Sequence, residues 1–180
     1  MRHVLLLSIL SLSVVTAAEA GVAPAPRVVA HSSDPGGPVP IADSIVVEKK
    51  ARRLTLYHQG RLLKTYRVAL GSNPVGAKQV AGDGRTPEGL FSIDYKNDRS
   101  DFHLALHISY PDSAHRARAE AMGMSPGGNI LIHGLPNKSG STGAFHRLKD
   151  WTDGCIALTD EEIDGVWSAV SVGTPVEIKP

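Results

Sequence analysis

The sequence predicts a mainly β domain with two short helices inserted among its strands. Most apolar residues fall in short runs that are rich in β-branched side chains or that alternate strictly with polar residues. Turn residues, above all glycine and proline, separate these runs. Only two segments carry the capping signals that begin a helix. We therefore expect strands to dominate the fold, and the sequence contains no internal repeat.

The domain is expected to begin near Ala42 with a β-meander. Residues 44–48 form a β-branched run, which predicts the first strand. Residues 54–57 and 62–70 are predicted as two further strands. They flank a turn in which Gly60 is free to adopt a positive φ.

The remaining elements follow in chain order. Residues 82–89 are rich in turn residues and precede a short predicted strand at 90–93. Alternating apolar residues predict a half-buried strand at 102–110, with His103 and His107 on its more polar face. The last predicted elements are a helix at 112–122, a strand at 129–132, a helix that starts at the capping box Thr159-x-x-Glu162 and runs to about 170, and a strand at 174–178.

The first twenty residues have the pattern of a secretory signal peptide. Arg2 and His3 precede an apolar run at 4–15, and Ala18-Glu19-Ala20 has the small-x-small form that signal peptidase cleaves. The run is too short for a permanent membrane span, although an uncleaved N-terminal anchor remains the alternative. Residues 21–41 are rich in proline and glycine and are predicted to be a linker, which leaves 42–180 as the folded domain.

Charge and cysteine content exclude several classes of function. Lys and Arg number 19 against 18 Asp and Glu, for a formal charge of +1, so nothing points to nucleic acid or an anionic membrane as partner. No later segment is apolar for long enough to cross a bilayer. The single cysteine, Cys155, excludes an intramolecular disulfide and a multi-cysteine metal site.

Cys155 and His133 are the candidate reactive pair. A thiol becomes a strong nucleophile only as the thiolate, which needs a base within hydrogen-bond reach or a positive local field. Gly154 allows close backbone approach, and the helix after Thr159 favours the thiolate if its N-terminus points at the sulfur. His133 ends an apolar run, where Gly134 then turns the chain away, and a strand end is a rigid mount for a general base.

The two motifs together resemble a known family. Ile-His-Gly followed some twenty residues later by Thr-x-Gly-Cys-Ile is similar to the L,D-transpeptidase catalytic domain, the YkuD type of bacterial cell-wall enzymes. The resemblance extends over most of the chain after residue 42, through further segments in the family's order: 53–57, 82–89, 108–111 and 126–128.

The resemblance implies a β-sandwich-like fold and a cysteine acyl transfer on peptidoglycan in the periplasm or cell envelope. Cys155 would attack a stem-peptide carbonyl and form a thioester, and His133, oriented by a backbone carbonyl, would move the proton. A stem-peptide amine, a murein-linked lipoprotein or water would resolve the thioester. No metal or cofactor is implied. Backbone N–H groups around Gly154 and Cys155 are the expected oxyanion donors, supported by the neighbouring Gly134, Thr152 and Asp153.

Two departures from the family pattern leave the acyl acceptor open. Asp153 stands where members often have histidine, and Ala157 where they commonly have arginine or asparagine. Loss of a guanidinium at Ala157 removes a fork that could bind a carboxylate. A hydrolase that uses the same thioester is therefore one alternative. A wall-binding module with an unreactive Cys155 is the other.

Four further groups have two interpretations each. His146 and Arg147, between the two motifs, either line the mouth of the cleft or belong to a solvated loop. Arg85 either binds a substrate carboxylate or stabilises its turn together with Glu88. Trp151 and Trp167 are either packing anchors or ligand platforms, and we interpret them as packing anchors. His103 and His107 could hold a metal with His115 or His146, but hydrogen bonding explains them adequately, and no metal is predicted.

Overall fold

The computed structural model describes residues 41–138 and 142–180. Within these ranges the fold is mainly β with two short α-helices, as the sequence predicts. The expected signal peptide, residues 1–20, and linker residues 21–40 lie outside the described residues. The domain boundaries therefore stay predictions.

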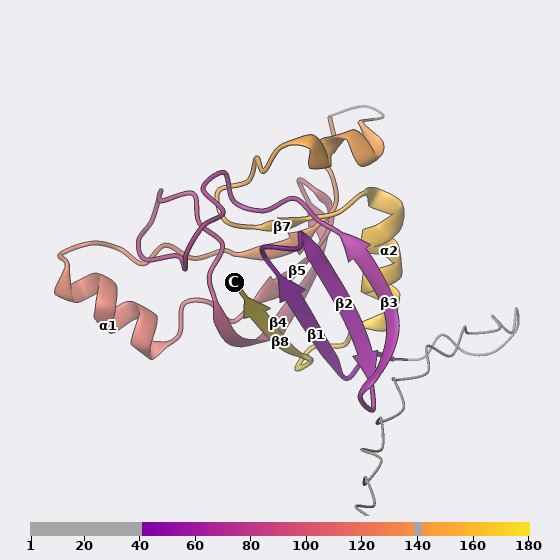
Figure 1. Ribbon diagram of the computed structural model, residues 1–180, viewed down its shortest axis with the longest axis horizontal. Helices are drawn as coiled ribbons and strands as arrows, with labels where there is room; N and C mark the ends of the chain where they lie inside the picture. Colours follow the sequence, from indigo (N-terminus) through magenta and orange to yellow (C-terminus); the bar gives the residue numbers. More distant parts are fainter. Residues whose placement is uncertain (1–40, 139–141) are drawn as a thin grey trace, which may run out of the picture. The chain divides into compact units, whose positions relative to one another are not determined.

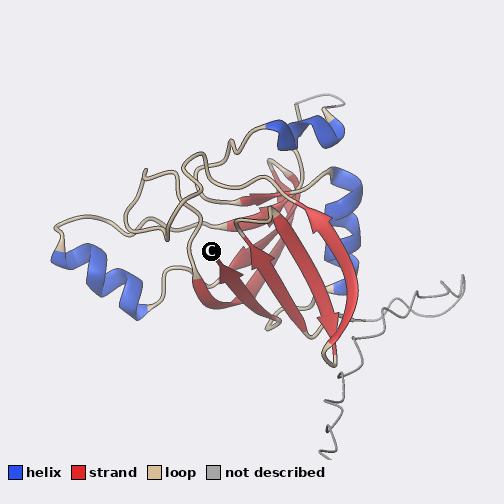
Figure 2. Cartoon of the chain, in the orientation of Figure 1, coloured by secondary structure: helices blue, strands red, loops and turns tan. Residues whose placement is uncertain are grey.

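One curled sheet contains every strand of the described ranges (Figures 1 and 2). Its eight strands lie in the order β3-β2-β1-β8-β4-β5-β6-β7. Apolar side chains from both halves of the sheet form one buried cluster. The strands are β1 (Ser44–Glu48), β2 (Arg53–His58), β3 (Arg61–Arg67), β4 (Gly89–Ser100), β5 (His103–Ile108), β6 (Leu131–His133), β7 (Ile156–Ala157) and β8 (Pro175–Lys179).

The two ends of the sheet meet. β3 is the first strand in the order and β7 the last. Just beyond β3, Ala69 forms an antiparallel bridge to Ala157 of β7, with N–H to O distances of 3.0 and 2.9 Å in the two directions. Next along the chain, Gly71 bridges Thr152. Residues 69–71 thus form a strap across the end of the sheet. The strap satisfies backbone groups of β7, which would otherwise be an open edge, and it holds the segment around Cys155 against the rest of the sheet.

Both predicted helices are present. α1 (Ser113–Ala121) is capped by the Asp112 carboxylate, and α2 (Asp160–Ala169) begins with the predicted capping box. α2 packs on the sheet through a buried apolar stripe that includes Ile163 and Val166, whereas α1 buries only Ala119 and stands out from the sheet (Figure 1). No helix of the described ranges is long and apolar enough to cross a membrane.

Several strand boundaries differ from the sequence prediction; β5, for example, ends at Ile108, two residues before the predicted end. β4 continues to Ser100, well beyond the predicted 90–93, because its polar second half pairs with β5 through two register irregularities. β3 ends at Arg67, since residues 68–70 leave β2 to reach β7. β6 is displaced by one or two residues from the predicted 129–132 and includes His133.

Two short elements were not predicted at all. The segment interpreted as a loop between the motifs contains a 3-10 helix, η1 (Gly143–Leu148). β7 is only two residues long, too short for any periodicity to reveal it. Both lie between His133 and α2, so they determine where the cysteine is placed.

Candidate active site

The pairing of β6 with β7 brings Cys155 and His133 to one cavity. The strands are parallel, with Ile132 opposite Ile156 and His133 opposite Ala157. One residue earlier, the Leu131 N–H donates to Cys155 Sγ at 3.4 Å. Because residues two apart on a strand share a face, His133 lies on the same face as Leu131 and its neighbour Cys155. Both side chains line a cavity of about 320 Å³.

Aromatic rings hold the imidazole of His133 in place. The Phe102 ring lies 4.4 Å away and the Trp151 ring 5.9 Å away, centroid to centroid, and only 1% of His133 is exposed. His133 Nδ1 lies 2.6 Å from the carbonyl oxygen of Gly134. A carbonyl only accepts, so Nδ1 carries the proton and Nε2 is left as the basic nitrogen of the neutral ring.

Burial keeps both reactive groups uncharged near neutral pH. The pKa of His133 is lowered to about 4, chiefly by burial and to a smaller extent by the nearby His146, against the opposing effect of the Gly134 carbonyl. Burial also raises the pKa of the Cys155 thiol above its usual value. The α2 N-terminus, which carries Asp160 and two further acidic residues in its first turn, therefore does not hold the cysteine as a thiolate. The resting pair is a thiol and a neutral imidazole.

The turn before the cysteine tolerates only glycine at position 154. Gly154 has a φ of 130°, and a Cβ there would lie 2.6 Å from the Arg85 carbonyl oxygen. Thr152 braces the same turn, because its hydroxyl donates to the Cys155 carbonyl at 2.8 Å and accepts from the Gly154 N–H at 3.2 Å. The N–H of Cys155 has no hydrogen-bond partner in the described part of the chain. Within the described ranges, this N–H is therefore the hydrogen-bond donor beside the sulfur that no other group occupies.

Gly134 joins the histidine to helix α2. A Cβ at this position would lie 2.7 Å from Asp160 Oδ1 and 3.0 Å from Ile163 Cγ2. Asp160 Oδ1 also accepts from the Leu135 N–H at 2.8 Å. The chain after His133 is thus held against the first turn of α2, which fixes the carbonyl that orients the imidazole.

His146 lies in a second cavity that shares Trp151 with the first. This cavity, also about 320 Å³, is lined mainly by apolar side chains, among them Leu135 and Phe145. Trp151 Nε1 donates to His146 Nδ1 at 3.4 Å, so the proton of a neutral His146 sits on Nε2. That nitrogen is buried and has no partner among the described residues.

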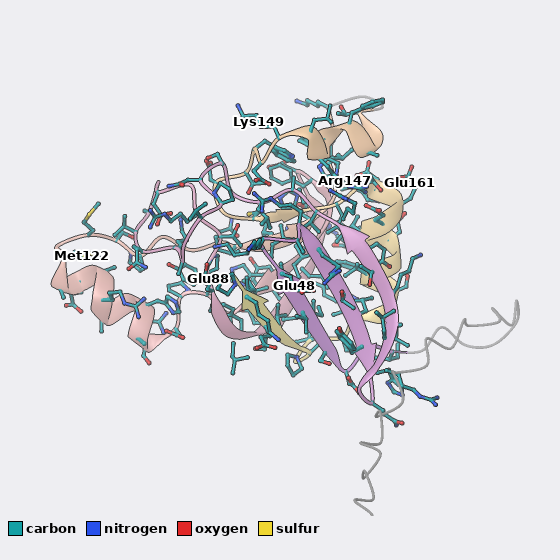
Figure 3. The ribbon with its side chains drawn as sticks, viewed as in Figure 1. Glu48, Glu88, Met122, Arg147, Lys149 and Glu161 are labelled. Atoms are coloured by element: carbon teal, nitrogen blue, oxygen red, sulfur yellow. The ribbon has the colours of Figure 1, made fainter. Side chains whose placement is uncertain are left out.

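The other predicted site residues occupy different positions. Arg147 forms an ion pair with Glu162 of the capping box, and Figure 3 shows it beside the start of α2. The Arg85 guanidinium lies near Gly76 and does not line the cavity of Cys155, so Arg85 reaches the site through its backbone carbonyl. Asp153 is exposed, lines the cavity, and its charge raises the pKa of Cys155.

The remaining histidines do not gather at a metal centre. His103 pairs with Asp164, His107 with Asp94 and His115 with Asp112, at 2.6 to 2.8 Å. Across the described ranges, no three His, Cys, Asp or Glu side chains are close enough together to hold an ion.

Two groups that shape the site are not marked by the sequence patterns. The sequence predicts a strand at Phe102 and a packing role for Trp151, yet both rings pack against His133. Asn129, whose carbonyl lies 3.6 Å from Cys155 Sγ, was not singled out either. No local sequence pattern marks Phe102 or Asn129 as part of the site, because each of them reaches it only through the fold.

The curled β sheet of this chain thus presents a cysteine and a neutral histidine to one cavity. The sequence profile of the L,D-transpeptidase catalytic domain (YkuD) matches residues 42–178. The chain therefore belongs to the L,D-transpeptidase catalytic domain family. Its fold and family are those that the sequence predicts.

Individual relatives share less than a third of their aligned residues with this chain. YafK of Escherichia coli (strain K12), whose name places it provisionally among the L,D-transpeptidases, is 28% identical over 134 residues, which cover 71% of this chain and 46% of YafK. The chain thus spans about half the length of the curated relatives that it matches. The helical cell shape determining protein Pgp2 from Campylobacter jejuni superposes with a TM-score of 0.59 at 22% identity, covering 79% of this chain and 52% of Pgp2. An L,D-transpeptidase from Mycobacterium smegmatis gives a TM-score of 0.50 at 17% identity, covering 77% and 59%.

The space around Gly154 predicts a strong effect of adding one methyl group. Gly154→Ala is expected to lower the free energy of unfolding by more than about 3 kcal/mol, because the positive φ is strained and the Arg85 carbonyl must move. Gly60→Ala is the matched control, since Gly60 also has a positive φ (72°) but nothing within 4 Å of the new Cβ, and it should cost only about 1 kcal/mol. Urea unfolding measures both. Equal losses would show that the contact with Arg85 does not constrain the turn.

Proposed function

We propose that the protein is an exported peptidoglycan L,D-transpeptidase that transfers an acyl group through a thioester on Cys155. The observation that supports this most strongly is the shared cavity, in which Cys155 and a neutral His133 lie on adjoining parallel strands. Membership of the L,D-transpeptidase family supplies the substrate class, a peptidoglycan stem peptide.

In the proposed first step, Cys155 Sγ attacks the carbonyl carbon of the donor stem peptide. The thiol proton passes to His133 Nε2, the nitrogen that the Gly134 carbonyl leaves without a proton. The tetrahedral intermediate then collapses, the C–N bond breaks, and the same proton goes from Nε2 to the leaving amine. The donor remains as a thioester on Cys155.

In the second step, an acceptor amine attacks the thioester carbon. His133 Nε2 takes a proton from this amine as the new amide bond forms, and returns it to sulfur when the C–S bond breaks. Each cycle thus exchanges one amide for another and regenerates the neutral thiol and imidazole. Water in place of the amine would make the same site a hydrolase, which is the alternative that the sequence left open.

The oxyanion of each intermediate is proposed to bind the Cys155 N–H. This donor has no protein partner in the described ranges, whereas the Gly154 N–H already donates to Thr152. A preorganised donor of this kind contributes about 3 kcal/mol to transition-state stabilisation in other enzymes. Thr152 and Gly154 would then act by holding the turn, and Gly134 by fixing the histidine.

Among the predicted substrate-binding residues, His146 is a better candidate for contact with the substrate than Arg147 or Arg85. His146 lines a largely apolar cavity that shares Trp151 with the cavity of Cys155, so a substrate that extends past Trp151 would reach its side chain. Roles for Arg147 and Arg85 toward substrate stay predictions. Export to the periplasm or cell envelope, and a stem peptide or murein-linked lipoprotein as acceptor, are also proposals. Export rests on the pattern of residues 1–20.

Product analysis distinguishes the proposed reaction from its alternatives. Incubation of the protein with purified muropeptides, followed by mass spectrometry, is expected to show joined peptides, and Cys155→Ser should lower their formation at least about 10³-fold while the protein stays folded. Shortened peptides alone would assign the site to hydrolysis. No product with either protein would favour an inactive wall-binding module, and retained activity in Cys155→Ser would move the chemistry to another residue.

The low pKa of His133 predicts an unusual pH profile. His133 acts as a base only when neutral, and its pKa of about 4 means that kcat/KM should stay level from about pH 8 down to about pH 5 and fall below that. An ordinary histidine would lose activity from about pH 6.5. The unfolded chain binds this proton at the ordinary pKa, so stability also falls as the pH drops from about 6.5 towards 4.

The matched variant for this profile is Phe102→Ala. Removing the ring 4.4 Å from the imidazole admits water, which should raise the pKa of His133 and move the acidic limb of kcat/KM to higher pH. Circular dichroism at each pH checks that the protein is folded. The proposal that burial lowers the pKa of His133 would be contradicted if kcat/KM of the wild-type protein fell near pH 6.5 and the fall lay at the same pH in Phe102→Ala.

A further inference from the structure

Asp83 organises the turn-rich loop of residues 77–85. Its Oδ2 accepts from the N–H groups of Gln79 and Val80, at 2.7 and 3.2 Å. Its Oδ1 accepts from the Arg85 N–H at 3.0 Å and from Lys78 Nζ at 2.8 Å. These four donors keep the pKa of Asp83 down at about 2, against the opposing effect of burial. The loop is therefore built around one carboxylate.

This loop contacts the cysteine site on two sides. On one side a Cβ at Gly127 would lie 3.3 Å from Lys78 Cε, and Gly127 directly precedes the cavity-lining residues Gly128 and Asn129. On the other side the Arg85 carbonyl packs against Gly154. Movement of the loop would thus displace both the cavity-lining residues Gly128 and Asn129 and the turn at Gly154 that precedes Cys155.

Lys78 differs from the other fully buried lysine, Lys49, in how its ammonium is satisfied. An ammonium has three N–H donors. Lys49 Nζ has three acceptors, the carbonyls of Gly76 and Thr86 and the carboxylate of Glu88. Lys78 Nζ is equally buried, but its one acceptor within the described ranges is Asp83 Oδ1. All three N–H donors of Lys49 therefore have an acceptor, as expected of a structural lysine, whereas two N–H donors of Lys78 have no partner among the described residues.

We propose that the Lys78–Asp83 pair is a positioning element of the cysteine site, in which Asp83 fixes the loop and the Lys78 ammonium stabilises negative charge that develops at Cys155. The inference rests on the proposed role of Cys155 as nucleophile. Charge appears at the sulfur during proton transfer to His133, and a buried ammonium acts on it through a medium of low polarity.

The charges around Cys155 agree with the proposed effect of Lys78 on the sulfur. Lys78 lowers the pKa of the thiol, whereas Asp153 and above all burial raise it. Lys78 is thus the member of the pair whose charge favours the thiolate, and the Asp83 carboxylate is its counter-charge. His133, the other titratable group that lines the cavity, is neutral at pH 7.

The test measures alkylation of Cys155 by uncharged iodoacetamide against pH, with intact-protein mass as the readout. Lys78→Met should move the midpoint of the profile to higher pH by about half a unit to one unit, so that alkylation below the midpoint is about 3- to 10-fold slower. Lys78→Arg keeps the cation and should stay within about twofold of the wild type. Melting temperatures of all variants show whether they fold.

Lys49→Met is the matched control, since it also removes a buried lysine that is paired with a carboxylate at 2.8 Å. It should lower the melting temperature and leave the alkylation profile unchanged. The proposal is overturned if Lys78→Met has the wild-type profile, or if Lys49→Met shifts the profile by the same amount, because both results would reduce Lys78 to a purely structural role.

Asp83→Asn keeps the proposal testable if Lys78→Met does not fold. Removing the carboxylate leaves the ammonium without its counter-charge, so the profile should move to lower pH, opposite to Lys78→Met. A shift to higher pH, or none, overturns the proposal. Alkylation requires no turnover, so this outcome is independent of the muropeptide assay, and failure of the proposed reaction would show in that assay alone.

Discussion

The parallel pairing of two very short strands, β6 and β7, is the constraint on which the site depends. Parallel neighbours cannot be joined by a tight turn, so the chain needs a long crossover between His133 and Cys155, and η1 lies in it. The pairing fixes which side chains share a face, and it places the sulfur beside Leu131 and the imidazole two residues further along. A strand as short as β7 has few bonds of its own. It is held by β6 on one side and by Ala69 of the strap on the other.

Burial of this strand pair determines its chemistry. The same enclosure that orders His133 between Phe102 and Trp151 removes water from the imidazole and the thiol, which favours the neutral form of each. The proposed mechanism therefore moves the proton during attack, and no standing ion pair is required. Charge then appears in a poorly solvated cavity, where the free Cys155 N–H and a nearby buried cation have their largest effect. In the proposed mechanism, reactivity therefore depends on the groups that stabilise charge in the transition state.

Much of the fold was predictable from local sequence signals. β1, β2 and both α-helices are where the β-branched runs and the capping residues Asp112 and Thr159 place them, because those signals act over a few residues. The curl of the sheet was not predictable, since the bridge of Ala69 to Ala157 joins residues far apart in the chain. Cys155 and His133 were identified from their motifs, but their common cavity depends on β7, which is too short to leave a pattern. Phe102 and Lys78 act on the site through space, and single-sequence patterns do not carry that information.

The most direct test of the account is whether substrate acylates Cys155. The protein is mixed with a tetrapeptide muropeptide without added acceptor, quenched in acid within the first turnovers, and its intact mass is measured. The thioester mechanism predicts a covalent adduct on Cys155 with the mass of the donor acyl group, which is absent from Cys155→Ala and disappears when an acceptor amine is added. Consumption of the muropeptide with no adduct on the wild-type protein, or the same adduct on Cys155→Ala, would contradict it.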